Sequence, residues 1–504
     1  MHQQTRDALE QAVAACADEP IRFSGGIQPH GYLISCDPRD SRVRHVSENC
    51  RELFELDPEA LIGLPLNELL PIALPFADDL AQLEARFGNA AEYLASINIG
   101  IRARFCDVSL HVAQGLAHLE IEPQPQNRQD LAAADLVHDM IFRIGLQTAE
   151  AGALHAAVAD QVRRLTGFDR VMVYRFLHDD TGEVIAESLA KDVPSYLGLR
   201  YPASDIPPQA RALYLRNRVR VIADTDYQPS PIVPALHADG GPLDLSLHGL
   251  RSVSPVHLEY MRNMGMAASM SISIVVDGRL WGLIACHHRA PRQLPPRHRT
   301  AADLLGMFYS LRVASLEHMQ RATQKAHSHE IRTRLLHALG STDAPAELLP
   351  QLLDDLREMI PSDAALLVSP DGLSHTGDAV DADTLADARA WLARQEDAAV
   401  LATHAADEWR HAASGSWAGL LAMRIGKDQA VLLLRREQVE EVRWAGEPVK
   451  HLVSTDDGVR LAPRRSFNSW RETVRGQSSH WDDAALEDAG AATVLLRRAL
   501  AARQ

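Results

Sequence analysis

The stretch Tyr201–Pro207 holds a single carboxylate, Asp205, between two prolines. Proline fixes the backbone angle φ and removes an amide donor, so this stretch can be neither a helix nor a central strand. We expect a stiff loop that ends where Pro208 opens a helix running to Asn217, which puts Asp205 close to a helix N-terminus. Taken alone, Asp205 could simply cap that helix. In a rigid loop it could also present an acceptor to a ligand.

The five cysteines differ in what they could do. Cys36, Cys106 and Cys286 lie in apolar or strand-like contexts and are expected to be small core residues. Cys50 stands at a predicted helix start and could be either a core or a functional residue. Cys16 lies in a polar N-terminal arm outside any predicted core, which suits a reactive thiol, although such arms often carry residues without a role.

The five cysteines include no CxxC pair and are too few for a disulfide framework. We therefore expect the protein to be located in a reducing cytoplasm. The net charge of −16 argues against a nucleic-acid partner, which would need a basic face. No apolar run reaches the roughly 18 residues of a membrane span, so no membrane partner is expected. The polar N-terminus has no signal-peptide character.

The segment Ser328–Thr333 is similar to the phosphoacceptor box of histidine kinases, with His329 as the acceptor. Such a kinase also needs an ATP-binding domain, and no Gly-rich or Asn-rich nucleotide box follows in the sequence. Arg334 also stands where that box has proline. We therefore interpret His329 as a residue on the solvated face of a long helix, and we predict that this chain is not an enzyme.

The predicted elements indicate an α+β fold with three domains in tandem, each with a central antiparallel sheet. At 504 residues the chain has the length of about three domains. The expected boundaries are an arm at 1–20, a first domain at 21–125, a second at 126–318 and a third at 319–504. In the first domain we expect strands at 43–46, 97–105 and 108–112, with a helical stretch at 50–69.

The second domain is predicted to begin with one helix over 131–165, followed by strands at 170–176 and 183–188. A long insertion at 224–251, rich in Pro, Gly and His, is expected to be functional because structureless loops of that length are uncommon inside domains. Asp277-Gly278 between alternating β-branched residues predicts a hairpin of strands 269–276 and 279–286.

A helix over 296–339 is predicted to join the second and third domains. The third domain repeats the α+β pattern, with strands expected near 365–368 and 429–435. It also contains a long hairpin-like excursion at about 442–470, before a last helix at 484–502.

Separated stretches of the chain resemble the signatures of bacteriophytochromes, a family of red-light photoreceptors. In chain order they are Cys16–Ile21 with Ile27–Gly31, Tyr201–Pro207, Ser254–Tyr260, Trp281–His288, and Trp444–Gly446 with Pro463–Phe467. Their order and their spread over nearly all of the chain make the resemblance highly specific. One departure is Phe23-Ser24-Gly25, where relatives usually have Ile-Pro-Gly. The lost proline loosens a turn but leaves attachment chemistry untouched.

The resemblance implies PAS, GAF and PHY domains and a linear tetrapyrrole, biliverdin IXα, bound in the GAF domain. Bilins carry two propionates, four nitrogens and a long apolar system, so they need cations, acceptors for N–H groups and aromatic walls. The residues implied to bind it are Asp205, Ile206, Pro207, His257, His287, Tyr174, Tyr196, Tyr201, Tyr260, Arg220, Arg251, Ser269, Ser271, Met172 and Tyr214.

Within that set, Arg220 and Arg251 would hold the propionates, because guanidinium groups suit carboxylates. Ser269 and Ser271 share one face of their strand and could add hydroxyl donors. His257 would lie with Asp205 at the pyrrole nitrogens. In the same way His287 would hold the terminal ring carbonyl, and the tyrosines and Met172 would surround the ring that rotates. For Met172, core packing is an equally good interpretation.

Covalent attachment is implied at Cys16. Phytochromes with reduced bilins have a cysteine directly before the histidine of the pocket helix, and this chain has Val256 there. The bacterial branch instead uses the N-terminal thiol, which adds to the A-ring vinyl group. That branch also passes its N-terminal arm through a loop of the GAF insertion, although no sequence pattern here demonstrates such threading.

The resemblance therefore predicts a red/far-red photoreceptor that switches by Z/E isomerisation of its bilin. The excursion at 442–470, called the tongue, would report the isomer through Arg464, Ser466, Phe467, Trp444 and Trp481. The alternative is a ligand-gated PAS–GAF regulator that binds haem or a cyclic nucleotide.

A homodimer through the long helices is expected, with Leu304, Phe308 and Leu311 as its apolar stripe, although that stripe could instead pack on its own GAF domain. No effector follows the last helix. We expect either a sensor core from a longer protein or a separate effector, for which a histidine kinase is one candidate.

Overall fold

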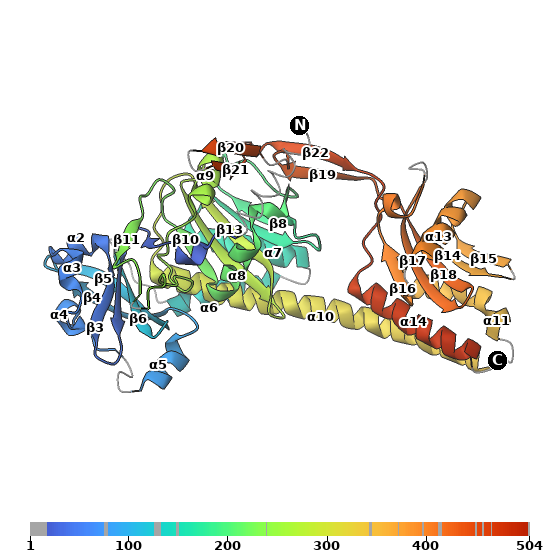
Figure 1. Ribbon diagram of the computed structural model, residues 1–504, viewed down its shortest axis with the longest axis horizontal. Helices are drawn as coiled ribbons and strands as arrows, with labels where there is room; N and C mark the ends of the chain where they lie inside the picture. Colours follow the sequence, from blue (N-terminus) through green and yellow to red (C-terminus); the bar gives the residue numbers. More distant parts are fainter. Residues whose placement is uncertain are drawn as a thin grey trace. The chain divides into compact units, whose positions relative to one another are not determined.

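The computed structural model describes most of the 504-residue chain and divides it into two compact units (Figure 1). The first unit comprises 1–314 with 443–470, and the second comprises 315–442 with 471–504. The residues described are 18–74, 79–124, 133–147, 151–237, 239–341, 345–370, 372–395, 398–411, 416–448, 451–455, 458–464 and 466–501. None of the helices in these ranges is both long and apolar enough to span a membrane.

The first domain is an antiparallel sheet in the order β1-β11-β3-β2-β6-β5-β4. Its strands are β1 (Gly26–Ile27), β2 (Tyr32–Asp37), β3 (Arg42–Ser47), β4 (Glu92–Ile99), β5 (Arg104–Ala113), β6 (Leu116–Pro123) and β11 (Ser230–Val233). Its helices are η1 (Ile21–Phe23), η2 (Glu48–Cys50), α2 (Arg51–Phe54), α3 (Pro58–Leu61), α4 (Leu66–Leu69) and α5 (Leu80–Phe87). Residues from these short helices pack with apolar residues of the sheet to form the core of the domain.

The strand expected at 97–105 was wrong, because a turn divides that stretch into β4 and β5. Gly100 adopts a φ of +76° and Ala103 a φ of +46°, which are turn conformations. A side chain at Gly100 would also meet the carbonyl oxygen of Leu53 at 2.1 Å, so the turn approaches backbone closely. Alternation of apolar residues continues through the turn and therefore did not reveal it.

Strand β11 comes from the insertion of the second domain, yet it lies in the sheet of the first domain between β1 and β3. On the other edge of β1, Ile27 forms a bridge with Arg251, which lies at the end of the same insertion. The amides of Ser252 and Gln28 complete this contact, by donating to Gly26 and Leu250 respectively. The N-terminal segment thus runs between two stretches of the insertion.

The second domain is built on an antiparallel sheet in the order β10-β12-β13-β7-β8-β9. Its strands are β7 (Arg170–Phe176), β8 (Gly182–Leu189), β9 (Arg200–Tyr201), β10 (Val219–Ile222), β12 (Ala268–Val276) and β13 (Arg279–His288). Its helices are α6 (Ala133–Gln147), α7 (Ala151–Thr166), η3 (Ala203–Asp205), α8 (Pro208–Arg216), α9 (Pro255–Asn263) and the first part of α10 (Pro296–Gly340). The predicted Asp277-Gly278 hairpin is confirmed, with both turn residues at positive φ.

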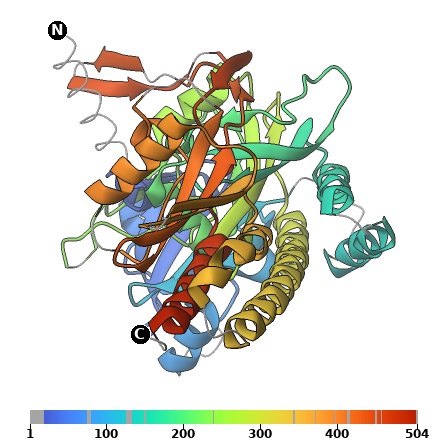
Figure 2. The same ribbon diagram turned by 90° about the vertical axis from the view of Figure 1, so that its right-hand side faces the viewer.

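The single helix expected over 131–165 was wrong, since the described residues form two helices there, α6 and α7. Figure 2 shows them as separate bodies. Apolar residues stay near helical spacing on both sides of the break, from Val137 and Ile144 to Leu154 and Val158. Periodicity alone therefore cannot locate the break.

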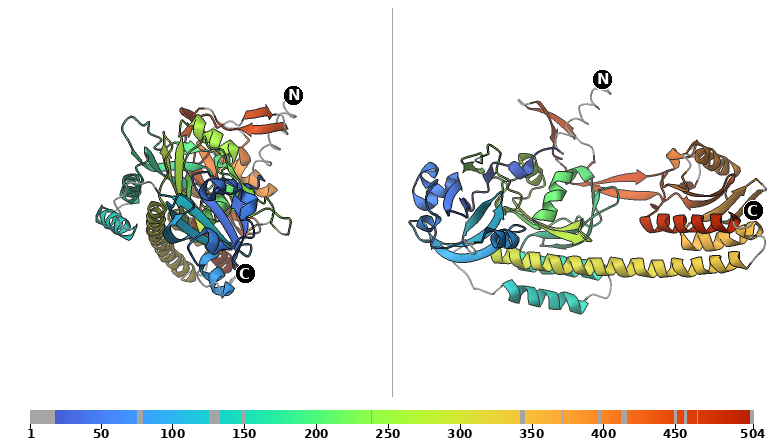
Figure 3. Two further views of the ribbon diagram at one scale, coloured as in Figure 1. Left: turned by 90° about the vertical axis from the view of Figure 1, so that its left-hand side faces the viewer. Right: turned by 60° about the horizontal axis from the view of Figure 1, so that its bottom comes forward.

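The third domain, in the second unit, is an antiparallel sheet in the order β15-β14-β18-β17-β16 with helices on both faces (Figure 3). Its strands are β14 (Ala364–Ser369), β15 (Gly372–Gly377), β16 (Val400–Thr403), β17 (Trp417–Gly426) and β18 (Gln429–Arg436). Its helices are the last part of α10, α11 (Pro345–Leu348), η4 (Leu349–Leu352), α12 (Leu353–Met359), α13 (Ala382–Arg394), η5 (Ala406–Glu408) and α14 (Asp483–Ala501). The excursion expected at 442–470 contains β20 (His451–Thr455) and β21 (Gly458–Ala462), and is flanked by β19 (Glu440–Ala445) and β22 (Ser469–Val474).

Together these sheets and helices confirm the predicted α+β class with three tandem domains.

Candidate functional site

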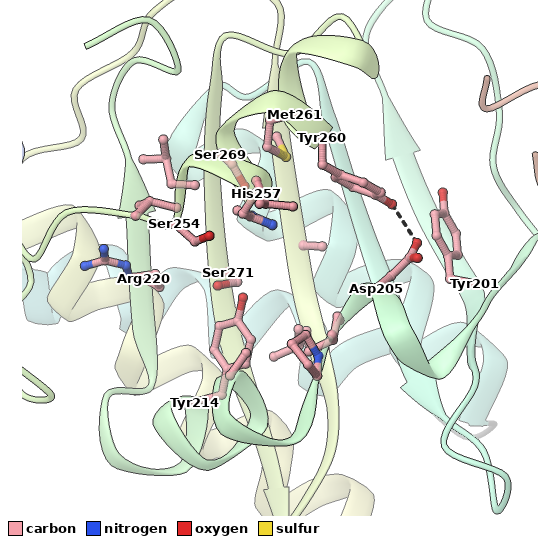
Figure 4. A pocket seen from close by; sticks show the side chains of 18 of the residues that line it. Tyr201, Asp205, Tyr214, Arg220, Ser254, His257, Tyr260, Met261, Ser269 and Ser271 are labelled. Carbon is pink, nitrogen blue, oxygen red and sulfur yellow. Dashed lines mark hydrogen bonds between the residues drawn. The ribbon is translucent and has the colours of Figure 1, made fainter. Parts of the chain in front are cut away.

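A cavity lies in the second domain against its sheet, between η3 and α8 on one side and α9 on the other (Figure 4). Strands β10, β12 and β13 form its floor, and two segments distant in sequence also reach it. Residues that line it are Glu19, Ile21, Met172, Tyr174, Tyr201, Asp205, Ile206, Pro207, Leu213, Tyr214, Arg220, Arg251, Val256, His257, Tyr260, Met261, Met264, Ser269, Ser271, Ala285, His287, Pro448, Pro463 and Arg464, among others. Of the residues implied to bind the bilin, all that the structure describes line the cavity except Tyr196.

Asp205 does not cap the following helix. The N-cap position of α8 is Pro207, and no side chain caps the helix. The carboxylate of Asp205 instead accepts a hydrogen bond from Tyr260 Oη at 2.9 Å and forms an ion pair with the guanidinium of Arg464. Figure 4 shows the first of these contacts. The two prolines thus hold Asp205 where its carboxylate faces the cavity and its partners.

The segment carrying Arg464 covers the cavity beside Asp205. Arg464 also donates to the carbonyl of Ala445, and its own carbonyl accepts from Asn263 Nδ2 at 3.0 Å. Phe467 packs edge-on against Tyr260, with ring centroids 5.0 Å apart. Burial lowers the pKa of Arg464, but the charge of Asp205, its hydrogen bond and the neighbouring tyrosines together outweigh burial, so the pKa is raised. The arginine is therefore a permanent cation held against the carboxylate.

Aromatic side chains surround the Asp205 end of the cavity. Tyr174 and Tyr201 pack edge-on at 5.7 Å, and Tyr174 lies directly over Gly182, where a Cβ would come 1.8 Å from its Cζ. Glycine is required there because the ring occupies the space of a side chain. Burial and the nearby Asp205 raise the pKa of Tyr174 and Tyr260, so both stay neutral.

The hydroxyl of Tyr201 is buried and has no hydrogen-bond partner among the described residues. Leaving such a group unpaired costs about 1–3 kcal/mol, so a bound ligand or water at this end of the cavity would relieve that cost.

Two buried arginines mark the opposite end of the cavity. Arg220 donates to the carbonyls of Gly249, at 2.9 Å, and Arg251, and Arg251 donates to the carbonyl of Ile21 at 2.8 Å. In the described part of the chain, neither guanidinium forms an ion pair with a carboxylate. Burial and the charge of Arg220 lower the pKa of Arg251 to about 9. Two adjacent buried cations facing a cavity favour an anionic ligand.

Between these ends, the strands present polar side chains in register. Ser269 on β12 lies opposite His287 on β13, and Ser271 lies opposite Ala285, so all four face the cavity. Cys286, between Ala285 and His287, points to the other face. Burial lowers the pKa of His287 to about 3, and the ring is neutral at pH 7. Its Nδ1 is buried and has no partner among the described residues.

Helix α9 contributes His257, Tyr260 and Met261 to the lining, and Met264 at its C-cap follows at helical spacing. Burial, with a smaller effect of Arg220, lowers the pKa of His257 to about 4, so the imidazole is neutral. Sequence reasoning missed Met261 and Met264. The signal for them was their spacing of four and seven residues from His257.

The N-terminal segment also reaches the cavity. Glu19 and Ile21 line it, and Ser254 Oγ donates to the Glu19 carboxylate at 3.1 Å. Sequence reasoning had not assigned these two residues to the site. Cys16 lies outside the described residues. In the sequence it precedes Glu19 by three residues.

The other cysteines are buried in the structure as free thiols. Cys36, Cys106 and Cys286 are core residues as predicted, and Cys50 is one as well. Burial raises the pKa of Cys50 and Cys106 to about 11, so neither is a thiolate at neutral pH. Among the described residues, no cysteine lines the cavity.

Some implied residues lie away from the cavity lining. Tyr196 packs behind it, with the guanidinium of Arg170 3.6 Å from its ring centroid. Trp481 lies in the core of the second unit and donates to the Thr403 carbonyl at 3.0 Å.

In the tongue, Trp444 forms a parallel bridge with Arg200, and Ser466 is exposed. His329, on α10, is exposed as predicted, whereas the neighbouring Ser328 is buried and donates to Asp488.

Comparisons with known proteins agree with this architecture. The family models for a PAS fold, a GAF domain and the phytochrome region match residues 16–124, 152–312 and 328–504. Bacteriophytochromes of Pseudomonas aeruginosa and Xanthomonas campestris are 36% and 37% identical over 94% and 95% of this chain. The chain spans 65% of the length of the first relative and 78% of the second.

Solved structures give the same assignment. The crystal structure of a bacteriophytochrome from R. palustris is 34% identical, with a TM-score of 0.78 over 97% of this chain and 99% of that one. The phytochrome photosensory core module of Stigmatella aurantiaca is also 34% identical, with a TM-score of 0.80 over 97% and 98% of the two chains. These matches define a phytochrome photosensory core of PAS, GAF and PHY domains, and the chain belongs to the bacteriophytochrome family.

The Asp205–Arg464 contact generates a prediction for the tongue. Removing one partner of a buried ion pair costs about 3–5 kcal/mol, because the other charge is left unpaired. We expect Arg464→Ala and Asp205→Asn each to accelerate amide hydrogen exchange at least tenfold in a peptide covering 443–448. The double variant should exchange no faster than either single variant, since the two residues act as one pair.

Arg443→Ala is the matched control. That arginine is also in the tongue, but it is exposed and donates to the carbonyl of Leu197 at 3.3 Å, so its loss should change exchange less than threefold. Additive effects of the two single changes would show that the ion pair does not hold the tongue.

Proposed function

We propose that this chain is a red/far-red photoreceptor that binds biliverdin IXα covalently and switches between two states by its Z/E isomerisation. The observation that carries the proposal is the distribution of charge in the cavity. Two buried arginines with no carboxylate partner among the described residues lie at one end, and a carboxylate among tyrosines lies at the other. A ligand with two propionates and an extended apolar system matches that distribution.

The residues of the cavity fit this group. Arg220 and Arg251 would hold the propionates, with Ser269, Ser271 and Tyr214 as hydroxyl donors. The buried Tyr201 hydroxyl and His287 Nδ1, both without a partner among the described residues, are free for ligand groups. When bound, the bilin supplies absorption of red light and the isomerising double bond.

The protein's own part is to hold and shield the pigment. The neutral His257 and the backbone carbonyl of Asp205 would accept hydrogen bonds from pyrrole N–H groups, directly or through water. His287 would bind the carbonyl of the terminal ring. Tyr174, Tyr260 and Met172 give that end of the cavity apolar walls within which a ring can turn.

Attachment is assigned to Cys16. Support comes from Val256, which lines the cavity where other phytochromes have cysteine, and from the burial of the four described thiols away from the cavity. Its position three residues before Glu19, which lines the cavity, adds to this.

The tongue is the proposed reporter of the isomer. Arg464 is bound to Asp205 beside the ring that turns, so movement of that ring can make or break the pair. A coupling of several kcal/mol present in one state only is enough to bias a two-state segment. Comparing dark-reversion rates of the Arg464 and Asp205 variants with that of their double variant would test whether the pair differs between light states.

A homodimer is proposed because α10 exposes an apolar stripe of Leu304, Met307 and Leu311 in the first unit. Cytoplasmic location and an output partner such as a histidine kinase, on the same or another chain, are part of the same proposal. A haem or cyclic-nucleotide regulator is not favoured, since the relatives and structures named above are phytochromes.

The function is tested by mixing the purified chain with biliverdin and recording absorption before and after red light. We expect a red-absorbing complex that red light converts to a far-red-shifted or depleted spectrum and that far-red light or darkness restores. A complex whose spectrum does not respond to light, or the absence of a complex, would contradict the proposal.

A second prediction concerns attachment. Cys16→Ser should still bind biliverdin but release it on acid denaturation, whereas the wild-type chain keeps its pigment on a denaturing gel. Cys286→Ala is the control, because that thiol points away from the cavity, and it should keep the pigment attached. Pigment that remains bound to denatured Cys16→Ser would rule out Cys16.

A third prediction concerns the arginine pair, measured in the Cys16→Ser background so that binding is reversible. A charge-assisted hydrogen bond contributes about 1.5–3 kcal/mol, so Arg251→Gln should weaken biliverdin binding about 10–100-fold. The melting temperature of the apoprotein should not fall, since the change removes one of two repelling buried cations.

Two controls test whether Arg251 acts through the propionates of the ligand. Arg218→Gln removes an arginine paired with Asp303 outside the cavity lining and should leave affinity unchanged. Biliverdin dimethyl ester, which lacks the two negative charges, should bind the Arg251 variant and its parent equally. An equal loss of affinity for the ester would show that Arg251 acts on the shape of the cavity instead.

A further inference from the structure

Three histidines gather at the contact between the PAS sheet and the GAF insertion, away from the bilin cavity. His111 on β5 and His118 on β6 lie directly opposite each other in the sheet, and His248 reaches them from the insertion. Their ring centroids are 4.2–4.9 Å apart. All three are fully buried.

The hydrogen bonding of this cluster is incomplete. Both ring nitrogens of His111 and both of His248 are buried and have no hydrogen-bond partner among the described residues. A neutral imidazole always carries one N–H donor and one lone pair, so four polar positions are left unpaired in the protein interior. Each such group costs about 1–3 kcal/mol, which makes the cluster expensive as plain core packing.

His118, in contrast, is oriented by its neighbours. Its Nε2 lies 3.1 Å from the carbonyl of Ala113, which can only accept, so this nitrogen carries the proton. Its Nδ1 then accepts a hydrogen bond from the hydroxyl of Ser35 at 2.8 Å. An imidazole that donates one N–H to a backbone carbonyl has the orientation found at metal-binding histidines, and a metal ion here would replace the Ser35 hydroxyl at the other nitrogen.

His248 is positioned by a carboxylate on the same strand as His118. Glu120 accepts hydrogen bonds from the amides of Gly249, at 2.9 Å, and Leu250, at 2.6 Å. Because Glu120 lies two residues after His118, both side chains are on the same face of β6. Glu120 on β6 therefore holds the loop at Gly249 and Leu250, and this places the preceding residue, His248, beside His118.

The rings are also in the protonation state that coordination needs. Burial lowers the pKa of all three histidines, that of His118 to about 4, and the other two well below the usual value. Neutral imidazole is the form that binds metal ions.

We propose that His111, His118 and His248 bind one divalent transition-metal ion, Zn²⁺ above all, which fastens the PAS sheet to the GAF insertion. One ring nitrogen from each histidine lies within 4.8 Å of the others. A tetrahedral zinc site with Zn–N distances of about 2.0–2.1 Å needs nitrogens about 3.3 Å apart, so modest side-chain rotation completes it. The fourth position is left for water.

The test uses the purified chain, stripped with EDTA, incubated overnight with Zn²⁺ and then desalted. We expect one zinc ion per chain by elemental analysis and a raised melting temperature, since a ligand that binds only the folded state stabilises it. His248→Gln, which keeps a polar side chain of similar length, should lose both effects. His337→Gln removes an exposed histidine of α10 and should keep both.

A second measurement covers the case in which the variant does not fold. X-ray absorption of the zinc-loaded wild-type chain should give a first shell of about three imidazole nitrogens and one oxygen. Fewer imidazoles, no zinc retained by the wild-type chain, or equal zinc in the His248 and His337 variants would overturn the proposal. None of these results depends on biliverdin, so the photoreceptor proposal stands or falls separately.

Discussion

Buried charge is the constraint on which the pigment-binding domain depends. Asp205 is held between two prolines beside a cavity, where its carboxylate pairs with Arg464 and accepts a hydrogen bond from Tyr260. The loop and the tongue are therefore joined by this buried contact. At the far end, Arg220 and Arg251 have no such partner in the described part of the chain, and burial and the charge of Arg220 lower the pKa of Arg251. The charge at the Asp205 end of the cavity is thus paired within the protein, whereas the charges at the arginine end are available to an anionic ligand.

Short sequence patterns predicted many of the strands and helices that form this domain. The hairpin of β12 and β13 was predictable because Asp-Gly fixes its turn, and alternation then placed Ser269 and Ser271 on one face. Strand β7 and helix α10 also follow directly from their patterns. By contrast, the turn at Gly100 and the break between α6 and α7 leave apolar periodicity intact, so the sequence pattern runs through both.

Other features were beyond sequence reasoning because they depend on pairing between distant segments. Nothing in Ser230–Val233 indicates that it joins the sheet of another domain. His111 and His118 become neighbours only through the register of β5 and β6, and His248 only through the docking of its loop on Glu120. Most residues that the family signatures pointed to line one cavity, yet Glu19 and Ile21 became visible only once the N-terminal segment was seen beside Arg251.

The position of β11 also has a consequence for how the protein is made. The PAS sheet contains a strand that the ribosome produces only after all the PAS residues and part of the GAF domain. Until Ser230–Val233 has emerged, β1 has no neighbour in the sheet and one edge of β3 is open. The first domain in sequence therefore cannot complete its sheet when its own residues have been synthesised. Its final strand order must await the part of the GAF domain that carries β11.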